Sequence, residues 1–566
     1  MAEHDVVIRN GTVIDGTGAD ARTADVAITG GVITEVGHVD GSGTHEIDAD
    51  GALVTPGFVD IHTHYDGQAV WDERLQPSSW HGVTTVVMSN CGVGFAPVRE
   101  EDRNRLVELM EGVEDIPGTA IHEGISWEWE SLPEYLDAIE RRRHDIDFAA
   151  QVPHGALRLF VMGDRGGRGD AATPEDIAEM GRLAAEAVDA GALGFTTSRT
   201  RNHRTIKGEP TPTLKAAREE LVGIADALGH LGKGVLQVVS DFFDIDDEFG
   251  TVRAMAESSG RPISISLAQN AVFPDQWREL LDRLAEGNDA GLKMTGQVAP
   301  RPVGLVLGLQ ASMNPFLGNP AYVEIASLPL DERVAAMRGD GRRAAILAAA
   351  EGHNGVFGFD RIFELGDPPD YEPKAENSIA ARAQREGRAA TELAYDLVLG
   401  DDGTALLYTP FLNYVGGNLD ATHEMLAHPH TVPGLGDGGA HVGTICDASF
   451  TTTLLTLWGR DRDRGKFELP YLVQQHCRDT ARTVGLYDRG VLAPGYRADV
   501  NVIDFDGLRL SPPEIHHDLP AGGRRLLQKV QGYKHTIVNG VETYRDGEAT
   551  GALPGALVRG AQPTPV

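Results

Sequence analysis

Two histidines separated by one residue, His62 and His64, are the first side chains of this sequence that could carry out chemistry. They follow the apolar run from Phe58 to Ile61, which indicates a buried strand, and residues two apart on a strand point to the same side. Two imidazoles at one strand end can chelate a divalent ion such as zinc, which accepts nitrogen, sulfur and carboxylate ligands. The alternative is a pair of core or surface histidines.

Several motifs together resemble one known family. The string PGFVDIHTH around the two histidines is similar to the first-strand motif of the amidohydrolase superfamily. SNCG after VTTVVM resembles the N-acyl-D-amino-acid deacylase (D-aminoacylase) branch, as do PHGALRLFVMG, DAGALGFTTS, GDGGAH and VLAPGYRADVNVID, in this order. The resemblance covers most of the chain, although residues 300–400 match no pattern of that branch.

The resemblance implies roles for Cys91 and Asp437. In that branch the cysteine of NCG is a metal ligand, and a thiolate favours zinc over magnesium. Asp437 resembles the superfamily's eighth-strand aspartate, which touches the metal and shuttles the proton. The alternatives are a small buried cysteine and an aspartate that forms a turn before two glycines.

The sequence also departs from the family pattern. The branch places one histidine at the end of strand five and one at the end of strand six, but here these strands read VLQVVSDF and ISISLAQN. Strand four, ALGFTTSRT, lacks the lysine that bridges two metals in other branches. We therefore expect one zinc ion rather than two, held by His62, His64, Cys91 and Asp437.

Other polar side chains at the predicted strand ends could replace missing ligands or bind substrate. Histidines could face the same cavity, neutral groups could orient substrate, and an arginine offers a planar fork for a carboxylate. A solvated loop histidine or a structural salt bridge is the alternative for each. The candidates for substrate binding are His154, Arg199, His203, Gln237, Arg301 and His441.

Composition is that of an ordinary enzyme. Among 566 residues, 41% are hydrophobic, which is enough for a large core and more than one domain. The formal charge of −34 disfavours nucleic acid and anionic membranes as partners, and we expect a small-molecule substrate, with a homo-oligomer as an open alternative to a monomer. Three scattered cysteines, no signal peptide and no apolar run of membrane-spanning length predict a cytoplasmic protein.

The apolar runs predict an α/β fold, a distorted TIM-type (β/α)8 barrel with a small β-sandwich domain built from both termini. Helical patterns such as TPEDIAEMGRLAAEAVDAG separate the predicted strands. Periodicity alone would also allow an open doubly wound sheet, so the closed barrel depends partly on the resemblance. The predicted strands are 54–64, 84–90, 148–153, 193–198, 235–240, 263–267, 292–298 and 432–437.

Four regions follow from these patterns. Alternating apolar and polar residues with glycine turns predict a composite β-domain from residues 1–54 and 485–550. Residues 55–484 are expected to form the barrel, with a long insertion at about 300–430 that we interpret as a lid. Residues 551–566 are expected to be a tail, disordered after Gly560.

These observations favour a hydrolase of carbon–nitrogen bonds other than peptide bonds. The expected substrate is an N-acyl-D-amino acid or a similar amide bearing a carboxylate. Zinc lowers the pKa of a bound water to about 7, and Asp437 would take its proton and pass it to the leaving nitrogen. The alternatives are a cyclic-amide hydrolase, or a lyase or decarboxylase with one weak metal or none, and thirdly a non-catalytic binding relative.

Overall fold

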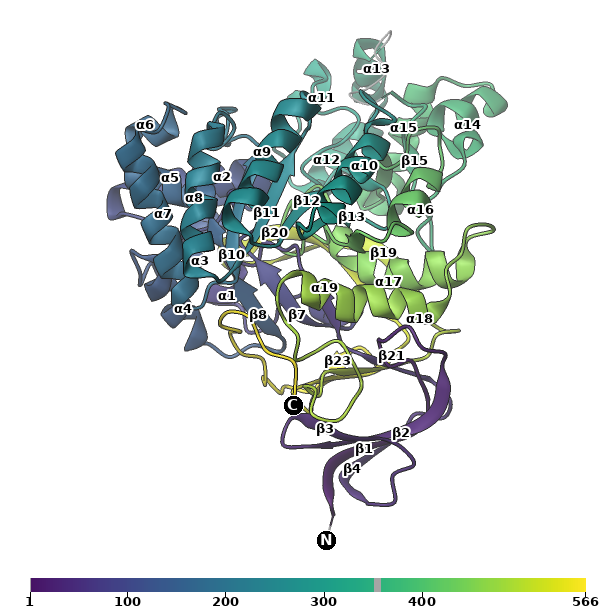
Figure 1. The fold of residues 1–566 in the computed structure, drawn as a ribbon. Helices are drawn as coiled ribbons and strands as arrows, with labels where there is room; N and C mark the ends of the chain where they lie inside the picture. The colour runs from purple at the N-terminus through teal and green to yellow at the C-terminus, as the bar shows by residue number, and fades with distance from the viewer. Residues whose placement is uncertain (1, 351–357) are drawn as a thin grey trace.

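The computed structural model describes residues 2–350 and 358–566, and parallel strands lie at its centre with helices around them (Figure 1). The side chains of these strands are mostly buried, as in β7, where every residue of VTTVVM is buried. Parallel strands covered on both faces have such continuous apolar sequences. The parallel strands are β6 (Phe58–Asp60), β7 (Val83–Met88), β8 (Asp147–Ala150), β9 (Val152–Pro153), β10 (Gly194–Arg199), β11 (Val235–Ser240), β12 (Ile263–Ser266), β13 (Met294–Val298) and β17 (Thr431–Pro433).

Hydrogen bonding divides these strands into two arcs. One sheet holds β6, β7 and β8, and a six-stranded sheet runs from β9 through β10, β11, β12 and β13 to β17. At one junction only Gln151 separates β8 from β9. At the other, Thr63 bridges Gly438, and the backbone N–H of Asp437 donates to the carbonyl of His62 at 2.9 Å. The second junction therefore brings the segment after β6 beside the segment after β17.

The first predicted strand, residues 54–64, is two strands, so the prediction of one continuous strand is wrong. β5 (Leu53–Pro56) pairs antiparallel with β18 (Val500–Ile503) in another sheet, and β6 begins the parallel arc. Gly57 separates them. A Cβ at this position would lie 2.1 Å from Oγ1 of Thr84 in β7. The close approach of β7 therefore requires glycine where the chain passes from one sheet to the next.

Amphipathic helices connect successive strands on the outside. The longest, α7, begins with a capping box between Thr173 and Asp176 and has proline at its first position. The helix before β11 ends at Gly232, whose φ of 70° suits a helix C-terminus. The main connecting helices are α4 (Leu132–Glu140), α7 (Pro174–Asp189), α8 (Arg218–Leu231), α9 (Ile245–Ser259) and α10 (Gln276–Asp289). The other helices of this part are α1 (Gln68–Trp71), α2 (Arg103–Glu114), α3 (Gly118–Gly124), α5 (His154–Met162), α6 (Asp164–Gly167), α16 (Asp420–Leu426), α17 (Phe450–Thr456), α18 (Leu469–Gln474) and α19 (Thr480–Thr483).

Strands from both ends of the chain share one nine-stranded sheet at the base of the molecule in Figure 1. Within it, β5 lies between β1 and β18 and so joins the two ends. Val26, Val54, Val502 and Ile537 belong to one buried apolar cluster of this sheet. Besides β5 and β18, its strands are β1 (His4–Val13), β2 (Arg22–Thr29), β3 (Val32–Gly37), β4 (Gly43–Asp48), β21 (Tyr533–Val538), β22 (Val541–Arg545) and β23 (Glu548–Ala549).

The segment between β13 and β17 has a core of its own, which includes Phe316, Met337 and Tyr395. In its strand β14, the N–H of Val306 donates at 2.7 Å to the carbonyl of Thr444, which lies in the loop after β17. Residues 351–357 of the predicted 300–430 insertion lie outside the described residues. The elements here are β14 (Val303–Leu307), β15 (Phe363–Glu364), β16 (Leu407–Leu412), α11 (Pro320–Val323), α12 (Leu330–Arg338), α13 (Asp340–Ala349), α14 (Ile379–Glu386) and α15 (Ala390–Val398).

A separate hairpin of β19 (Arg509–Leu519) and β20 (Gly523–Gln531) packs on the same loop. The N–H of Leu526 donates to the carbonyl of Val442 at 2.6 Å. The loop after β17 is therefore bonded both to the insertion and to this hairpin.

The tail after residue 550 does not follow the prediction of disorder beyond Gly560. The N–H groups of Gly555 and Val558 donate to the carbonyls of His144 and Phe148, each at 2.8 Å. Further on, the N–H of Gln562 donates to the carbonyl of Gly485 at 3.0 Å. The tail is ordered because its backbone pairs with the open side of β8 and with the segment after α19.

Among the residues that the structure describes, no helix has both the length and the apolar character needed to cross a membrane.

Candidate metal centre

The segment after β6 supplies two buried imidazoles. His62 and His64 are each 1% exposed, and their ring centroids are 5.6 Å apart. Both lie beyond the carboxyl end of β6, at the junction with the segment after β17. The structure therefore brings the two rings to the same end of the parallel strands.

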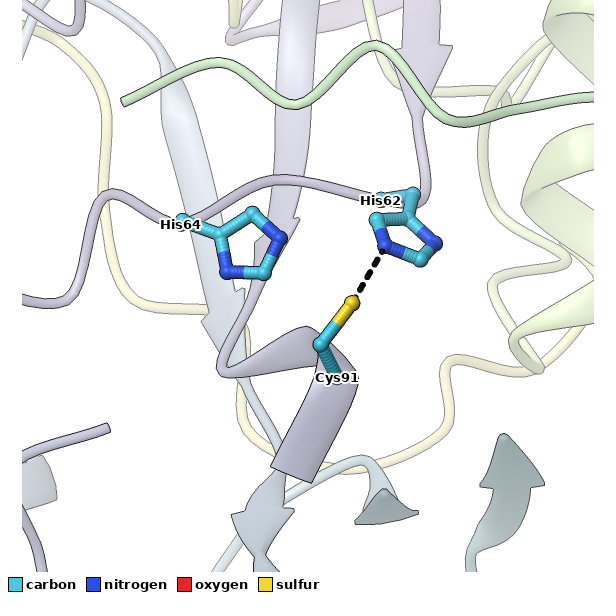
Figure 2. Close-up of side chains that lie close together, drawn as sticks. All are labelled: His62, His64 and Cys91. Carbon is cyan, nitrogen blue, oxygen red and sulfur yellow. Dashed lines mark hydrogen bonds between the residues drawn. The ribbon is translucent and has the colours of Figure 1, made fainter. Parts of the chain in front are cut away.

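Cys91 reaches these rings from the turn after β7. Ser89, Cys91 and Gly92 all have left-handed backbone angles, with φ of 65°, 55° and 67°, and the chain bends sharply there. This bend points Sγ of Cys91 toward His62, 3.2 Å from Nε2 (Figure 2). Ligand atoms of His62, His64 and Cys91 all lie within 4.8 Å of one another.

Asp437 faces the same point from the loop after β17. Its Oδ1 lies 3.5 Å from Nε2 of His62 and 3.7 Å from Nε2 of His64. The backbone of Asp437 is left-handed, with φ of 49°, and its N–H is held by the carbonyl of His62. All four side chains expected at the metal are thus gathered in one place.

The types of donor atom in the cluster suit a cation. Burial raises the pKa of the Cys91 thiol to about 11 and lowers the pKa of His62 to about 4. Burial opposes ionisation of Asp437 as well, but His64 and His62 hold the pKa of its carboxyl far below the usual value. A metal ion stabilises a neighbouring thiolate, and two imidazoles, a thiolate and a carboxylate are ligand types that zinc accepts. The donor set therefore fits a zinc ion.

Gln297 holds the ring of His62 and was absent from the predicted site. Its Nε2 donates to Oγ of Ser264 at 2.9 Å, which leaves Oε1 to accept from Nδ1 of His62 at 2.8 Å. The lone pair of His62 Nε2 then faces Cys91 and Asp437. A polar residue within the apolar strand β13 was a visible signal, but nothing in the sequence pairs it with His62.

Glu114, at the end of α2, is a second residue that sequence reasoning missed. Its Oε1 lies 3.2 Å from Nδ1 of His64, and its Oε2 lies 3.8 Å from Nε2 of His441. In the sequence it is one of several acidic residues on a helix, and no pattern distinguishes it from a solvated one.

His203 and His441 lie near this cluster. Nδ1 of His203 lies 3.0 Å from Oγ of Ser198, and burial, with nearby His441, lowers the pKa of His203 to about 3. His441 has a left-handed φ of 48° and a side chain that is 22% exposed. These two rings are the candidates for substrate contact that the structure places beside the four donors.

Three other predicted contacts are engaged elsewhere. The ring nitrogens of His154 lie 2.8 Å from Oγ1 of Thr197 and 2.9 Å from Oε1 of Glu220. Arg199 donates to a backbone carbonyl at 2.7 Å, and the guanidinium of Arg301 lies 3.0 Å from Oδ1 of buried Asp447. His154 and Arg301 are buried and hold several protein atoms, whereas Arg199 makes one hydrogen bond and its Nε has no partner among the described residues.

Gln237 is a different case. It lies in β11 with 2% of its surface exposed, and both of its amide atoms lack a hydrogen-bond partner within residues 2–350 and 358–566. The ends of β11 and β12 carry Ser240 and Gln269, and neither strand contains a histidine.

Comparison with known proteins identifies the relatives of this chain. The sequence pattern of the amidohydrolase family matches residues 45–544. D-aminoacylase of Alcaligenes xylosoxydans xylosoxydans is 32% identical over 229 residues, which are 40% of this chain and 43% of that relative. An uncharacterised protein of Mycobacterium tuberculosis is 26% identical over 97% of this chain and 93% of its own length.

Solved structures show the same fold. A D-aminoacylase crystal structure aligns with a TM-score of 0.65 and 24% identity, covering 99% of this chain and all of the other. N-acyl-D-glutamate deacylase from Bordetella bronchiseptica, in complex with zinc and a phosphonate inhibitor, aligns with a TM-score of 0.64 and 24% identity, covering 98% of this chain and 99% of that one.

Proposed function

Because this chain belongs to the amidohydrolase family, we propose that it hydrolyses the amide bond of an N-acylated amino acid, with D-configured substrates preferred. The convergence of His62, His64, Cys91 and Asp437 at one end of the parallel strands carries this proposal. The named relatives that act on N-acyl-D-amino acids support the substrate class.

The architecture belongs to the same proposal. Residues 55–484 would form a distorted eight-stranded barrel, counting β8 and β9 as one strand, with the site at the carboxyl ends of its strands. Residues 1–54 and 485–550 would form the composite β-domain. The three cysteines of the chain are unpaired, which is compatible with the expected cytoplasmic location.

We propose that His62, His64, Cys91 and Asp437 hold one zinc ion. When bound, such an ion supplies a Lewis acid that acidifies water and polarises a carbonyl group. Gln297 keeps the lone pair of His62 directed at the cluster through its bond to Nδ1.

Asp437 is the proposed proton shuttle. Its Oδ1 lies 3.5 Å from Nε2 of His62 and 3.7 Å from Nε2 of His64, and in its ionised form this carboxylate can accept a proton from the attacking water. Addition of that water oxygen to the carbonyl carbon forms a tetrahedral species. When the C–N bond breaks, Asp437 returns the proton to the leaving nitrogen, which gives a carboxylic acid and an amine.

Substrate contacts in this proposal come from the rings beside the donors. His203 and His441 are close enough to the cluster to contact the acyl or carboxylate part of a substrate. Arg301 already binds Asp447 and Ser449, so we assign it no substrate contact.

The test is amine release from a panel of matched N-acyl-D- and N-acyl-L-amino acids with zinc supplied. We expect release from D-substrates. Asp437→Asn should keep folding and most of the metal but lower kcat by about 10²- to 10⁴-fold, because an amide cannot accept the proton. His62→Ala should lose metal and activity together. No release from any member of the panel would contradict the proposal.

A second candidate is a cyclic-amide hydrolase, or a lyase or decarboxylase, on the same scaffold. It is favoured by the absence of histidine from β11 and β12, where the resemblance to the deacylase branch implies one at each strand end. Turnover of a cyclic amide or carbon–carbon cleavage, without amine release from the acylated panel, would select this candidate.

A further inference from the structure

A buried carboxylate with no hydrogen bond lies directly behind the metal centre. Glu114 ends α2 with a side chain that is 1% exposed, and neither of its carboxylate oxygens has a hydrogen-bond partner among the described residues. Burial of an unpaired carboxylate is unfavourable, and the C-terminus of a helix also disfavours an anion. Neither helix formation nor packing accounts for a glutamate at this position.

The position of His64 suggests what Glu114 does. Oε1 of Glu114 lies 3.2 Å from Nδ1 of His64, although the two groups are not aligned as a hydrogen bond. The other ring nitrogen, Nε2, lies 3.7 Å from Oδ1 of Asp437, on the side of the metal cluster. Glu114 and the cluster therefore lie on opposite sides of the ring.

The second histidine has the same arrangement. Oε1 of Gln297 accepts from Nδ1 of His62 at 2.8 Å, while Nε2 of His62 lies 3.2 Å from Sγ of Cys91. In both cases an oxygen from another part of the chain lies at Nδ1, and Nε2 faces the proposed ion. The arrangement matches the general way in which proteins orient histidine ligands.

We propose that Glu114 is the positioning residue of this metal centre. It accepts the Nδ1–H of His64 and keeps the lone pair of Nε2 directed at the ion, without touching the ion itself. This role rests on the proposed metal site. A carboxylate in this position also increases the basicity of the imidazole, which strengthens metal binding.

The backbone fixes Glu114 where this role requires it. Its carbonyl accepts the N–H of Val442, at 3.1 Å, from the loop that also carries Asp437. Asp115 then turns the chain with a left-handed φ of 54°. The end of α2 and the loop after β17 are thus bonded to each other, so Glu114 and Asp437 keep their relative positions.

The experiment compares Glu114→Gln with the matched change Glu111→Gln, one turn earlier on α2. Oε1 of Glu111 accepts the N–H of Gly118 at 3.0 Å, which a glutamine oxygen can also accept. The full-length proteins are freed of metal, zinc affinity is measured by competition with a chelator, and cobalt spectra report the bond to the thiolate. Thermal unfolding of the metal-free proteins measures the fold separately.

We expect Glu114→Gln to bind zinc about 10- to 100-fold more weakly than the unaltered protein, with Glu111→Gln within threefold of it. At saturating cobalt, Glu114→Gln should keep the thiolate charge-transfer band and the same stoichiometry. Metal-free Glu114→Gln should unfold no more readily than the unaltered protein. If Glu114→Gln cannot be purified folded, Glu114→Asp is measured instead, with an expected loss of zinc affinity in the same direction.

Three results would overturn the inference. Zinc affinity of Glu114→Gln within threefold of the unaltered protein would leave the metal site standing but remove Glu114 from it. A changed ligand-field spectrum at full cobalt occupancy would make Glu114 a direct ligand. If the unaltered protein itself binds neither zinc nor cobalt, the proposed metal site fails and the role of Glu114 fails with it.

Discussion

Replacing Arg301 with methionine should destabilise the fold rather than weaken substrate binding. The guanidinium is 1% exposed and lies 3.0 Å from Oδ1 of Asp447. It also donates to Oγ of Ser449 at 2.9 Å and lies 3.8 Å from the ring centroid of Tyr371. Arg301→Met keeps the apolar volume but leaves the Asp447 carboxyl without a cation.

The size of this effect depends on pH through Asp447. Burial raises the pKa of Asp447 to about 6 although Arg301 lies beside it. Above pH 6 the unaltered protein holds an ion pair, whereas in Arg301→Met the carboxyl must remain protonated to stay buried. The difference in free energy of unfolding should therefore grow by about 1.4 kcal/mol for each pH unit above 6. At pH 8 it should approach the roughly 3 kcal/mol typical of breaking a buried ion pair.

Thermal unfolding at pH 6 and pH 8 measures this difference. A chain of 566 residues has an unfolding entropy of about 1.2 kcal/mol per kelvin, so roughly 3 kcal/mol lowers the midpoint by about 2.5 °C. The double change Arg301→Met with Asp447→Leu should recover most of the loss, because it removes the unpaired carboxyl. Equal midpoints for Arg301→Met and the unaltered protein at pH 8, together with a raised KM for carboxylate-bearing substrates, would refute this reasoning.

Two further changes test the core and the metal turn. His476 lies fully buried beside Phe58, and burial lowers its pKa to about 3, so the unfolded chain takes up this proton first and stability falls as pH drops from about 6.5 toward 3. His476→Phe lacks this proton uptake. When the pH is lowered from 7 to 5, the free energy of unfolding of the unaltered protein should therefore fall by about 2 kcal/mol relative to His476→Phe in thermal unfolding. The exposed control His38→Gln should show no such difference. Gly92→Ala places a Cβ 3.0 Å from Cα of Thr197 at a φ of 67°. It should cost about 1–2 kcal/mol in unfolding and weaken zinc binding in chelator competition, and an unchanged zinc affinity would contradict our view of the turn.

Residues on short, strongly patterned segments were predictable from the sequence. His62 and His64 stand two apart after an apolar run, and the structure places Cys91 beside them. Glu114 and Gln297 could not be predicted, because their partners are distant in sequence and no local pattern records the contact. The role of Arg301 was likewise invisible, since an arginine that binds substrate and one that binds Asp447 have the same letter and the same flanking residues.

The same limitation explains the fold errors. The run 54–64 has the pattern of one strand, and apolar periodicity does not reveal that Gly57 meets β7. The tail after Gly560 has a composition typical of disorder, yet its backbone finds carbonyls that β8 and the segment after α19 leave open. Local composition predicts the structure of a segment in isolation. The structure of these segments depends instead on contacts with residues distant in sequence.

The pairing of the tail with β8 has a consequence for how the protein is made. The N–H of Ala556 donates to Oδ1 of Asp147 across 409 residues of sequence. At roughly 5–20 residues per second, a ribosome needs about 20–80 s to synthesise that stretch. During this interval β8 lacks its late partner, and β5 likewise waits for β18. The nascent chain must therefore carry unpaired sheet edges for most of its synthesis, and such edges favour aggregation until the late strands arrive.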